Sequence, residues 1–212
     1  MGGVTAQSSG NRATSVGHLS HVGLQLFFER GFDETTVDDI AAAAGIGRRT
    51  FFRYFGSKND LPWGDFGALV SAMRDYLDAQ DESRPPLEVL REATLAFNRF
   101  PPEEVGYHRQ RMQLLLNVPS LVAHSTLRYA AWRGVVAEYA ARRMGLPVDH
   151  LRPQVIGWMF LSAALASYER WLADETSDLP ELIESALDEL GAVFGTREDE
   201  ALLALSAHPG GA

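Results

Sequence analysis

Residues 36–58 read TVDDIAAAAGIGRRTFFRYFGSK, and this stretch is the most informative part of the chain. Thr36 followed by Asp39 forms a Thr-x-x-Asp capping pattern, and the apolar residues that follow give a short helix one buried face. Gly45 lies where the backbone must turn, because glycine adopts a left-handed conformation without strain. A second short helix follows from Arg48 to Phe55. The stretch therefore predicts a helix-turn-helix.

The second helix of such a motif enters the major groove of DNA, and its N-terminal residues contact base edges. Arg48 and Arg49 occupy those positions, and the arginine fork pairs bidentately with guanine. Arg53 and Lys58 follow, so the window 48–58 contains basic residues and no acidic ones. The pattern favours DNA contact by Arg48 and Arg49 over the alternative that they are ordinary solvated helix residues.

The aromatic residues of this window have two interpretations. At helical spacing Phe51 and Phe55 are expected to point into the core, whereas a stacking platform for single strands is the less favoured alternative. Gly45-x-Gly47 is not a dinucleotide-binding fingerprint, since no strand precedes it and Thr50 stands where a glycine is needed.

The stretch resembles the DNA-binding domain of TetR-family transcriptional regulators over about residues 20–62. The matching residues are Thr-Val-x-x-Ile-Ala at 36–41, Ala-Gly-Ile at 44–46, Thr50-Phe51, Arg53-Tyr54-Phe55 and Ser57-Lys58. The resemblance implies phosphate contacts for Thr36, Tyr54 and Lys58, and base contacts for Arg48 and Arg49. It implies that Thr50 touches a phosphate or a base edge.

Two residues depart from the family pattern. Gly47 stands where the family often has serine, so the side-chain cap of the recognition helix is missing. Phe52 stands where the family often has tyrosine, so one phosphate hydrogen bond is lost and packing against the backbone sugar is the most that Phe52 is expected to provide.

The rest of the chain also reads as helical, giving an all-α protein of about nine helices. A first helix begins at Val16 and ends at Gly31, and Ser57 caps a fourth that is expected to run from Lys58 to Ala79. Later helices are expected at about 87–100, 102–117, 119–144, 153–172 and 180–194, with a last turn or two near 198–205. The expected domains are a disordered arm (1–15), the helix-turn-helix domain (16–60), a helical effector-binding and dimerisation bundle (61–195) and a tail (196–212).

Composition excludes several classes of protein. The 212 residues include 46% hydrophobic and 22% charged side chains, as in ordinary globular proteins. The absence of cysteine excludes a disulfide framework, a cysteine-ligated zinc site and a thiol nucleophile, and fits a reducing cytoplasm. No segment reaches the ~18 consecutive apolar residues of a membrane span, and no signal peptide is evident. A cytoplasmic protein without membrane contact is expected.

The net charge of −9 does not exclude a protein that binds nucleic acid. Acidic and basic residues balance in residues 1–62, so the remainder of the chain carries the excess negative charge. A local basic patch still attracts phosphate, because screening limits the reach of distant charges to ~10 Å.

The resemblance extends to PWGDF (62–66), AFNRFPPEE (96–104), AHSTLRYAAWR (123–133) and YERWLAD (168–174), where the chain is similar to regulators associated with mycofactocin biosynthesis gene clusters. Such regulators are released from a palindromic operator by a small effector, and the resemblance favours a repressor of mycofactocin-related genes. A fatty acyl-coenzyme A is the first candidate effector, since acyl-coenzyme A effectors occur among relatives and arginines suit its phosphates.

Large apolar residues on separate predicted helices favour an effector cavity within the bundle, although ordinary core packing explains each of them singly. The candidate lining residues are Trp63, Phe97, Phe100, Met112, Leu116, His124, Arg128, Trp132 and Trp158.

A homodimer is expected, because one recognition helix covers only a few base pairs and two-fold symmetry matches a palindromic operator. As the resemblance implies, the last two long helices are the best interface, where a pair from each subunit makes a four-helix bundle. The candidate contact residues are Ile156, Phe160, Leu161, Leu165, Leu182, Ile183, Leu187 and Leu190.

The sequence also bears on three other functions. His18 and His21 share a helical face, but no third ligand is evident, so no metal site and no cofactor are predicted. An enzyme is disfavoured because the sequence offers no convergent acid, base and nucleophile. The remaining alternative is a constitutive DNA-binding protein without an effector, which ligand-induced release from DNA would exclude.

Overall fold

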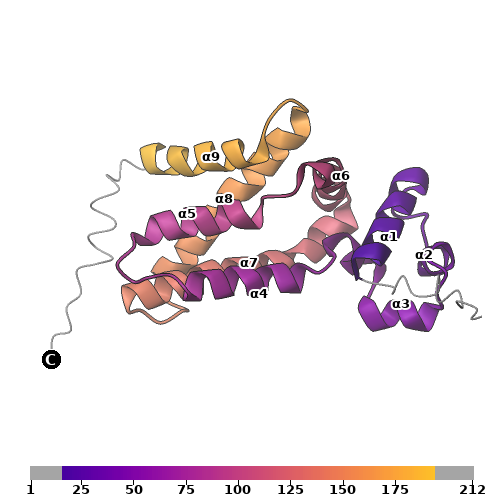
Figure 1. Cartoon of the computed structure of the whole chain (residues 1–212), viewed down its shortest axis with the longest axis horizontal. Coiled ribbons are helices and arrows are strands. Elements are labelled where there is room, and N and C mark those ends of the chain that lie inside the picture. The colour runs from indigo at the N-terminus through magenta and orange to yellow at the C-terminus, as the bar shows by residue number, and fades with distance from the viewer. Residues whose placement is uncertain (1–15, 194–212) are drawn as a thin grey trace, which may run out of the picture. The chain divides into compact units, whose positions relative to one another are not determined.

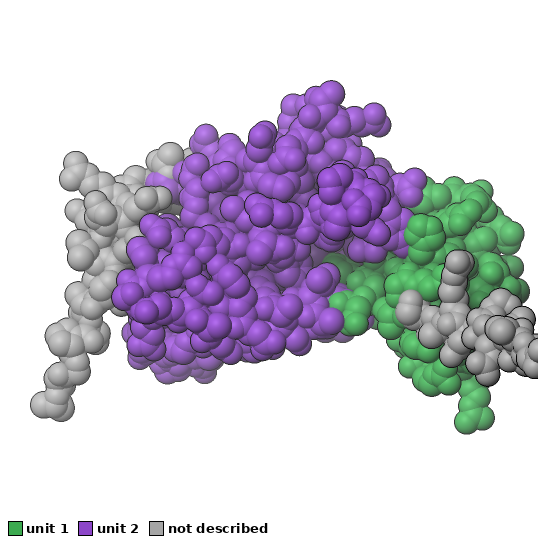
Figure 2. All heavy atoms as spheres, viewed as in Figure 1, with its two compact units in different colours: residues 1–65 green, residues 66–212 purple. Residues whose placement is uncertain are grey.

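The computed structural model describes residues 16–193, which form nine α-helices, one 3₁₀ helix and no strand. The predicted all-α class is therefore confirmed for this part of the chain. The arm expected at 1–15, the turn expected near 198–205 and the tail expected at 196–212 lie outside the described residues. The chain divides into two compact units, residues 1–65 and residues 66–212 (Figure 2).

The first unit, unit 1, carries the helix-turn-helix. Its elements are α1 (Val16–Arg30), α2 (Val37–Ala43), α3 (Arg48–Tyr54) and the 3₁₀ helix η1 (Lys58–Trp63). Leu24, Ile40 and Phe51, one from each α-helix, are fully buried at its centre. Burying one such side chain stabilises the fold by ~1.5–3 kcal/mol, which holds α2 and α3 at a fixed mutual angle against α1.

The expected fourth helix from Lys58 to Ala79 is corrected by the structure. It is divided into η1 and α4 (Phe66–Asp78), because Gly64 between them has φ +55°, outside the helical region, and Pro62 lacks a backbone donor. Ser57 occupies the N-cap position without capping, since its hydroxyl bonds to the Asp60 carboxylate instead. The break falls at the boundary between the two units.

The second unit, unit 2, is a bundle of six helices (Figure 1). They are α4 (Phe66–Asp78), α5 (Pro86–Phe97), α6 (Pro102–Asn117), α7 (Pro119–Met144), α8 (Leu151–Ala173) and α9 (Leu179–Val193). The longest helix, α7, packs against α4, α6 and α8, and α9 packs against α8 and α5. Prolines at the first turn of α5, α6 and α7 and a left-handed Gly145 after α7 set these boundaries.

The helices α7 and α8 cross at a point of backbone contact. A methyl group built on Gly157 of α8 would lie 2.9 Å from the carbonyl oxygen of Arg133 and 2.6 Å from its Cγ. Only glycine therefore permits this approach. Gly134, the next residue of α7, has no neighbour within 4 Å of such a methyl group.

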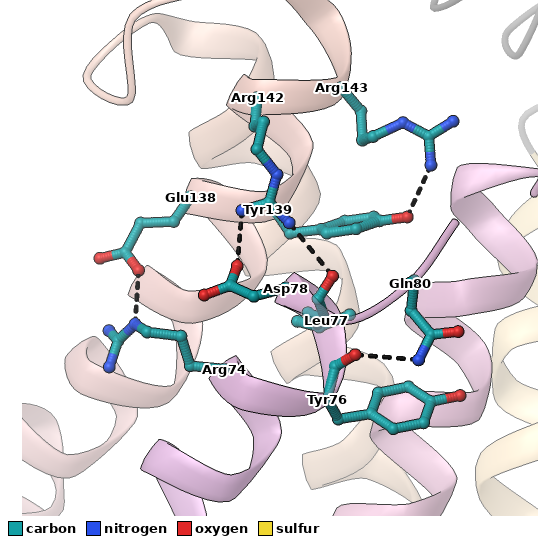
Figure 3. A network of polar contacts seen from close by, with 9 residues as sticks. All are labelled: Arg74, Tyr76, Leu77, Asp78, Gln80, Glu138, Tyr139, Arg142 and Arg143. Carbon is teal, nitrogen blue, oxygen red and sulfur yellow. Dashed lines mark hydrogen bonds and ion pairs between the residues drawn. The ribbon is translucent and has the colours of Figure 1, made fainter. Parts of the chain in front are cut away.

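A polar network joins α4 to the C-terminal half of α7 (Figure 3). Arg74 donates to Glu138 at 3.0 Å, and Arg142 donates to the Asp78 carboxylate at 2.6 Å and to the Leu77 carbonyl at 3.1 Å. These pairs are exposed, and such pairs stabilise by only ~0–1 kcal/mol each. Their main effect is to fix the register of the two helices. In the part of the chain that is described, no helix is long and apolar enough to cross a membrane.

Candidate DNA-binding surface and effector pocket

The start of α2 is fixed by a capping box. The Thr36 hydroxyl accepts from the Asp39 backbone N–H at 3.2 Å, and the Thr36 N–H donates to the Asp39 carboxylate at 2.8 Å. The hydrogen bonds from the Thr36 side chain and backbone hold the pKa of the Asp39 carboxyl below its ordinary value. The predicted cap is confirmed. Thr36 is exposed, so its predicted phosphate contact stays sterically open.

The turn between α2 and α3 depends on Gly45. Its φ is +67°, the left-handed region that the sequence required, and the Ile46 N–H donates to the Ala41 carbonyl at 2.9 Å. A side chain at position 45 would meet no neighbour within 4 Å, so the backbone angle alone demands glycine here.

Arg48 and Arg49 lie exposed at the N-terminus of α3, after Gly47, which provides no side-chain cap. Arg48 forms an ion pair with Asp38 of α2 at 2.8 Å, and its guanidinium lies 5.3 Å from the Phe52 ring centroid. Among the described residues, Arg49 has no ion pair. At the start of α3, Arg48 is therefore paired with a carboxylate, whereas Arg49 extends into solvent.

The aromatic residues of α3 divide between core and surface. Phe51 is fully buried and Phe55 is 4% exposed, with ring centroids 5.6 Å apart, which confirms both as core residues. Phe52 is 44% exposed. A stacking platform built from all three rings is excluded, and only Phe52 is available to pack against a DNA backbone.

Lys58 is engaged inside unit 1. Its ammonium donates to the carbonyls of Phe32, Asp33 and Thr35 at 2.8, 3.3 and 3.1 Å, and it lies 4.4 Å from the Phe32 ring centroid. These bonds tie η1 to the loop before α2, so Lys58 positions the helix-turn-helix. The sequence predicted only a contact between Lys58 and a DNA phosphate, and that contact stays a prediction. The DNA contacts predicted for Thr50 and Tyr54, which are half-buried, also stay predictions.

The residues predicted to line an effector cavity fall into separate groups. Phe97 and Trp132 pack edge to face, 6.0 Å apart, and Phe66 joins them from α4. Met112 and Trp132 are buried, and four further candidates of unit 2 are half-buried: Phe100, Leu116, His124 and Arg128. Phe100 lies between α5 and α6, and the other predicted residues named here lie on α5, α6 and α7; their role as an effector lining stays a prediction.

The structure corrects one of these candidates. Trp158 is 54% exposed on α8, and the Arg133 guanidinium lies 3.8 Å from its ring centroid, so Trp158 faces solvent and not the interior of the bundle. Trp63 is buried in η1 of unit 1, and its assignment to the lining of an effector cavity stays a prediction. Residue type alone does not reveal which face of a helix is inside, and Trp158 lies on the outer face of α8.

A pocket of about 190 Å³ lies within unit 2, between the end of α5, the start of α6 and the α8–α9 connection. Its walls include Phe100, Val105, His108, Trp171 and Leu179. Phe100 stacks on the His108 ring with centroids 3.7 Å apart. Of the predicted lining residues, Phe100 lines this pocket.

A chain of buried hydrogen bonds joins His108 and Asn98, which both line this pocket. His108 Nε2 lies 2.8 Å from the Tyr168 hydroxyl, which donates to Asn98 Oδ1 at 2.8 Å, and Asn98 Nδ2 donates to the Thr94 carbonyl at 2.7 Å. Burial and the Arg111 charge lower the pKa of His108 to about 3, and burial raises the pKa of Tyr168. His108 Nδ1 is buried without a hydrogen-bond partner in the structure.

Sequence reasoning did not single out His108 or Tyr168. Both residues lie beside apolar positions of their helices. An ordinary core residue with satisfied hydrogen bonds has the same placement, so this pattern does not identify a functional residue. The pairing joins positions 60 residues apart, which no local pattern reveals.

The predicted dimer residues also divide. Phe160, Leu161, Ile183 and Leu187 are buried within the protomer, between α8, α9 and the rest of the bundle, so they are not available at a surface. The prediction that these four residues contact the partner subunit is therefore wrong. The others remain half-exposed: Ile156, Leu165, Leu182 and Leu190.

Among the described residues, no group of three or more histidine, aspartate or glutamate side chains is arranged to hold a metal ion. His18 and His21 both lie exposed on α1.

Comparison with known proteins follows the same two-part division. Residues 19–61 match the family model for bacterial regulatory proteins of the tetR family, and residues 84–195 match the model for the MftR C-terminal domain. The second match alone spans more than half of the chain.

Two relatives extend the match to most of the chain. It is 45% identical to the candidate mycofactocin biosynthesis transcriptional regulator MftR of Mycobacterium tuberculosis (strain H37Rv), over 85% of this chain and 91% of that protein. It is 30% identical to the HTH-type transcriptional regulator TcmR of Streptomyces glaucescens, over 79% of this chain and 78% of that protein. A similar solved structure is Thermus thermophilus FadR, a repressor in complex with lauroyl-CoA, with 25% identity, TM-score 0.57, and coverage of 92% and 100%.

Proposed function

Because this chain belongs to the TetR family of bacterial transcriptional regulators, which are not enzymes, we propose that it is a repressor that a small effector releases from a palindromic operator. The observation that carries the proposal is the exposed pair Arg48 and Arg49 at the start of α3, directly after a glycine turn. The similarity to the mycobacterial mycofactocin regulator supports mycofactocin-related genes as the targets.

The two arginines contribute differently to recognition. Arg49 has no ion pair to break among the described residues, so its side chain is ready to meet a guanine edge. Arg48 must first leave Asp38, but an exposed pair costs only ~0–1 kcal/mol to separate. A bidentate contact with a base is worth ~1–3 kcal/mol, so the exchange is favourable.

The test uses DNA from upstream of the gene for this protein. Arg49→Ala should weaken operator binding by ~1–3 kcal/mol and relax preference at one base pair. Arg152→Ala is the matched control, because it removes the same charge from an exposed position on α8. Equal binding by wild type and Arg49→Ala would place recognition elsewhere, and equal loss in both variants would show an effect of net charge alone.

We propose that the repressor is a homodimer, since one α3 covers only a few base pairs. The half-exposed Leu182 and Leu190 lie on one stripe of α9, and Val155 and Trp158 expose apolar surface on α8. Leu182→Arg should shift the protein toward monomer in sedimentation, whereas Val122→Arg on α7 should not. A wild-type protein that sediments as a monomer at micromolar concentration and on DNA contradicts the proposal.

We propose an acyl-coenzyme A as the effector class, bound within unit 2. Aromatic and aliphatic side chains on α5, α6 and α7 suit an acyl chain, and the FadR structure holds lauroyl-CoA in a similar fold. The protein has one arrangement of units that fits DNA and one that does not. Regulation requires that the ligand have a higher affinity for the arrangement that does not fit DNA.

Titration with acyl-coenzyme A compounds tests this class. Operator affinity should fall, and tryptophan fluorescence should change because Trp132 lies within the expected lining. If neither quantity changes, this effector class is excluded. If no metabolite alters operator affinity, the second candidate, a constitutive DNA-binding protein, takes precedence.

A further inference from the structure

Lys58, which the family resemblance assigns to a DNA phosphate, has no hydrogen-bond donor left for one. Its ammonium donates to the carbonyls of Phe32, Asp33 and Thr35 at 2.8, 3.3 and 3.1 Å, and an ammonium has only three N–H donors. Lys58 is also the only lysine of the sequence. A compact ammonium fits three converging carbonyls, whereas the planar guanidinium of arginine does not. A bond to a phosphate oxygen would therefore replace a bond that the fold already makes.

The hydroxyl of Thr36, another residue assigned to phosphate, is occupied as well. It donates to the Asp39 carboxylate at 2.5 Å and accepts from the Asp39 backbone N–H at 3.2 Å. A hydroxyl has one proton, so this side chain has no second donor for a phosphate oxygen. The Asp39 carboxylate beside it also repels an anion. Two of the three side chains that the resemblance assigns to phosphate thus have no free donor.

Arg53 has the free donors that these two residues lack. It is exposed in the last turn of α3, and among the described residues it forms no ion pair. Its guanidinium lies 5.1 Å from the Tyr54 ring centroid, and Nη2 donates to the Tyr54 hydroxyl at 3.4 Å. A guanidinium has five N–H donors, so this contact leaves others free, and its fork matches two oxygens of a phosphate.

The position of Arg53 along α3 is the one that a phosphate contact requires. Arg49 and Arg53 are four residues apart, on the same face of the helix, and four residues span ~6 Å along the helix axis. The major groove is ~12 Å wide, so this distance is about half of its width. An arginine one turn beyond Arg49 is therefore within reach of the DNA backbone. The C-terminal end of a recognition helix also contacts the backbone in other three-helix domains of this kind.

We propose that Arg53 is the cation of the recognition helix that binds a DNA phosphate, in place of Lys58, whose ammonium stays bound to the carbonyls of unit 1. This inference rests on the proposed function, because it names the side chain that holds the DNA backbone at the same surface. Arg49 then contacts a base edge, and Arg53 on the same face fixes the helix against the phosphates.

The test is the salt dependence of binding to a DNA duplex of arbitrary sequence, which measures phosphate contacts without base preference. The logarithm of the binding constant falls linearly with the logarithm of the salt concentration, and each phosphate contact contributes ~0.9 to the slope. Arg53→Gln should therefore reduce the slope by ~0.9 for each recognition helix bound, which amounts to about eightfold weaker binding at ~0.1 M than at ~1 M salt. Arg152→Gln on α8 is the matched control, because it removes an exposed arginine from unit 2 and should leave the slope unchanged.

Two measurements test Lys58. Lys58→Met should keep the wild-type slope, measured on protein that circular dichroism shows to be folded. Nitrogen NMR of the ammonium gives the same answer without a substitution, because a label on lysine side chains reports on Lys58 alone. Its signal should keep its position when the duplex is added, since its three carbonyl partners do not change.

The inference is overturned if Arg53→Gln keeps the wild-type slope or changes it no more than Arg152→Gln does. It is also overturned if Lys58→Met reduces the slope as Arg53→Gln is expected to, or if the Lys58 signal shifts on addition of the duplex. In each of these cases wild type still binds DNA, so the proposed function is unaffected. A wild-type protein that does not bind the duplex even at low salt would contradict both.

Discussion

Replacing His108 by glutamine should make the protein less sensitive to mild acid. His108 is buried and its pKa is lowered from 6.5 to about 3, so the folded protein excludes a proton that the unfolded chain binds below pH 6.5. Stability is therefore complete above pH 6.5 and is lost as the pH falls toward 3. Glutamine does not titrate, and its Nε2 keeps a donor for the Tyr168 hydroxyl.

The magnitude follows from the distance between the two pKa values. Each pH unit below 6.5 costs ~1.4 kcal/mol as long as the folded state stays unprotonated. At pH 5, which is 1.5 units lower, wild type should have lost ~2 kcal/mol through His108. This is a large share of the ~5–15 kcal/mol by which a domain is stable.

The assay is urea unfolding followed by circular dichroism at pH 7.5 and pH 5.0, at equal protein concentration. The acid-induced loss should be ~2 kcal/mol smaller in His108→Gln than in wild type, because all other titrating groups are common to both proteins. The same loss in the two proteins would refute the reasoning, since it would mean that His108 accepts a proton in the fold.

Three further changes test the packing and the DNA-binding surface. Gly157→Ala should destabilise the protein by ~1–3 kcal/mol in thermal unfolding, because the added methyl meets the Arg133 backbone, whereas Gly134→Ala should be neutral or stabilising by up to ~1 kcal/mol; equal effects would contradict the close crossing. Lys58→Met should lower stability by ~1–3 kcal/mol through loss of three carbonyl contacts, and an unchanged unfolding midpoint would show that these bonds contribute nothing. Asp38→Asn should raise operator affinity by up to ~1 kcal/mol, because it frees an arginine and removes a negative charge beside the phosphates, and weaker binding would show that the ion pair positions that arginine for recognition.

Local patterns predicted most of unit 1. The Thr36 cap, the left-handed Gly45 and the buried Phe51 were each read from residues within four positions of one another, and each is confirmed. The fourth helix was the exception, since an apolar pattern runs across Gly64 although the backbone does not continue as a helix there.

In unit 2, the sequence did not predict which large apolar side chains of a helix face the core. Trp158 and Phe160 are two residues apart on α8, yet the first is 54% exposed and the second is 4% exposed. Both are large and apolar, so residue type did not distinguish them. Only the placement of α7 and α9 against α8 decides which face is covered.

The sequence by itself determined most of the helices, the Thr36 cap and the arginines at the start of α3, because these depend on short-range hydrogen bonds and on periodicity along one element. Only the tertiary structure decided that His108 meets Tyr168 and that Tyr168 meets Asn98, across separations of 60 and 70 residues. The physical reason is that a buried polar group is defined by its partners, and those partners come from helices that are brought together only by packing of the bundle.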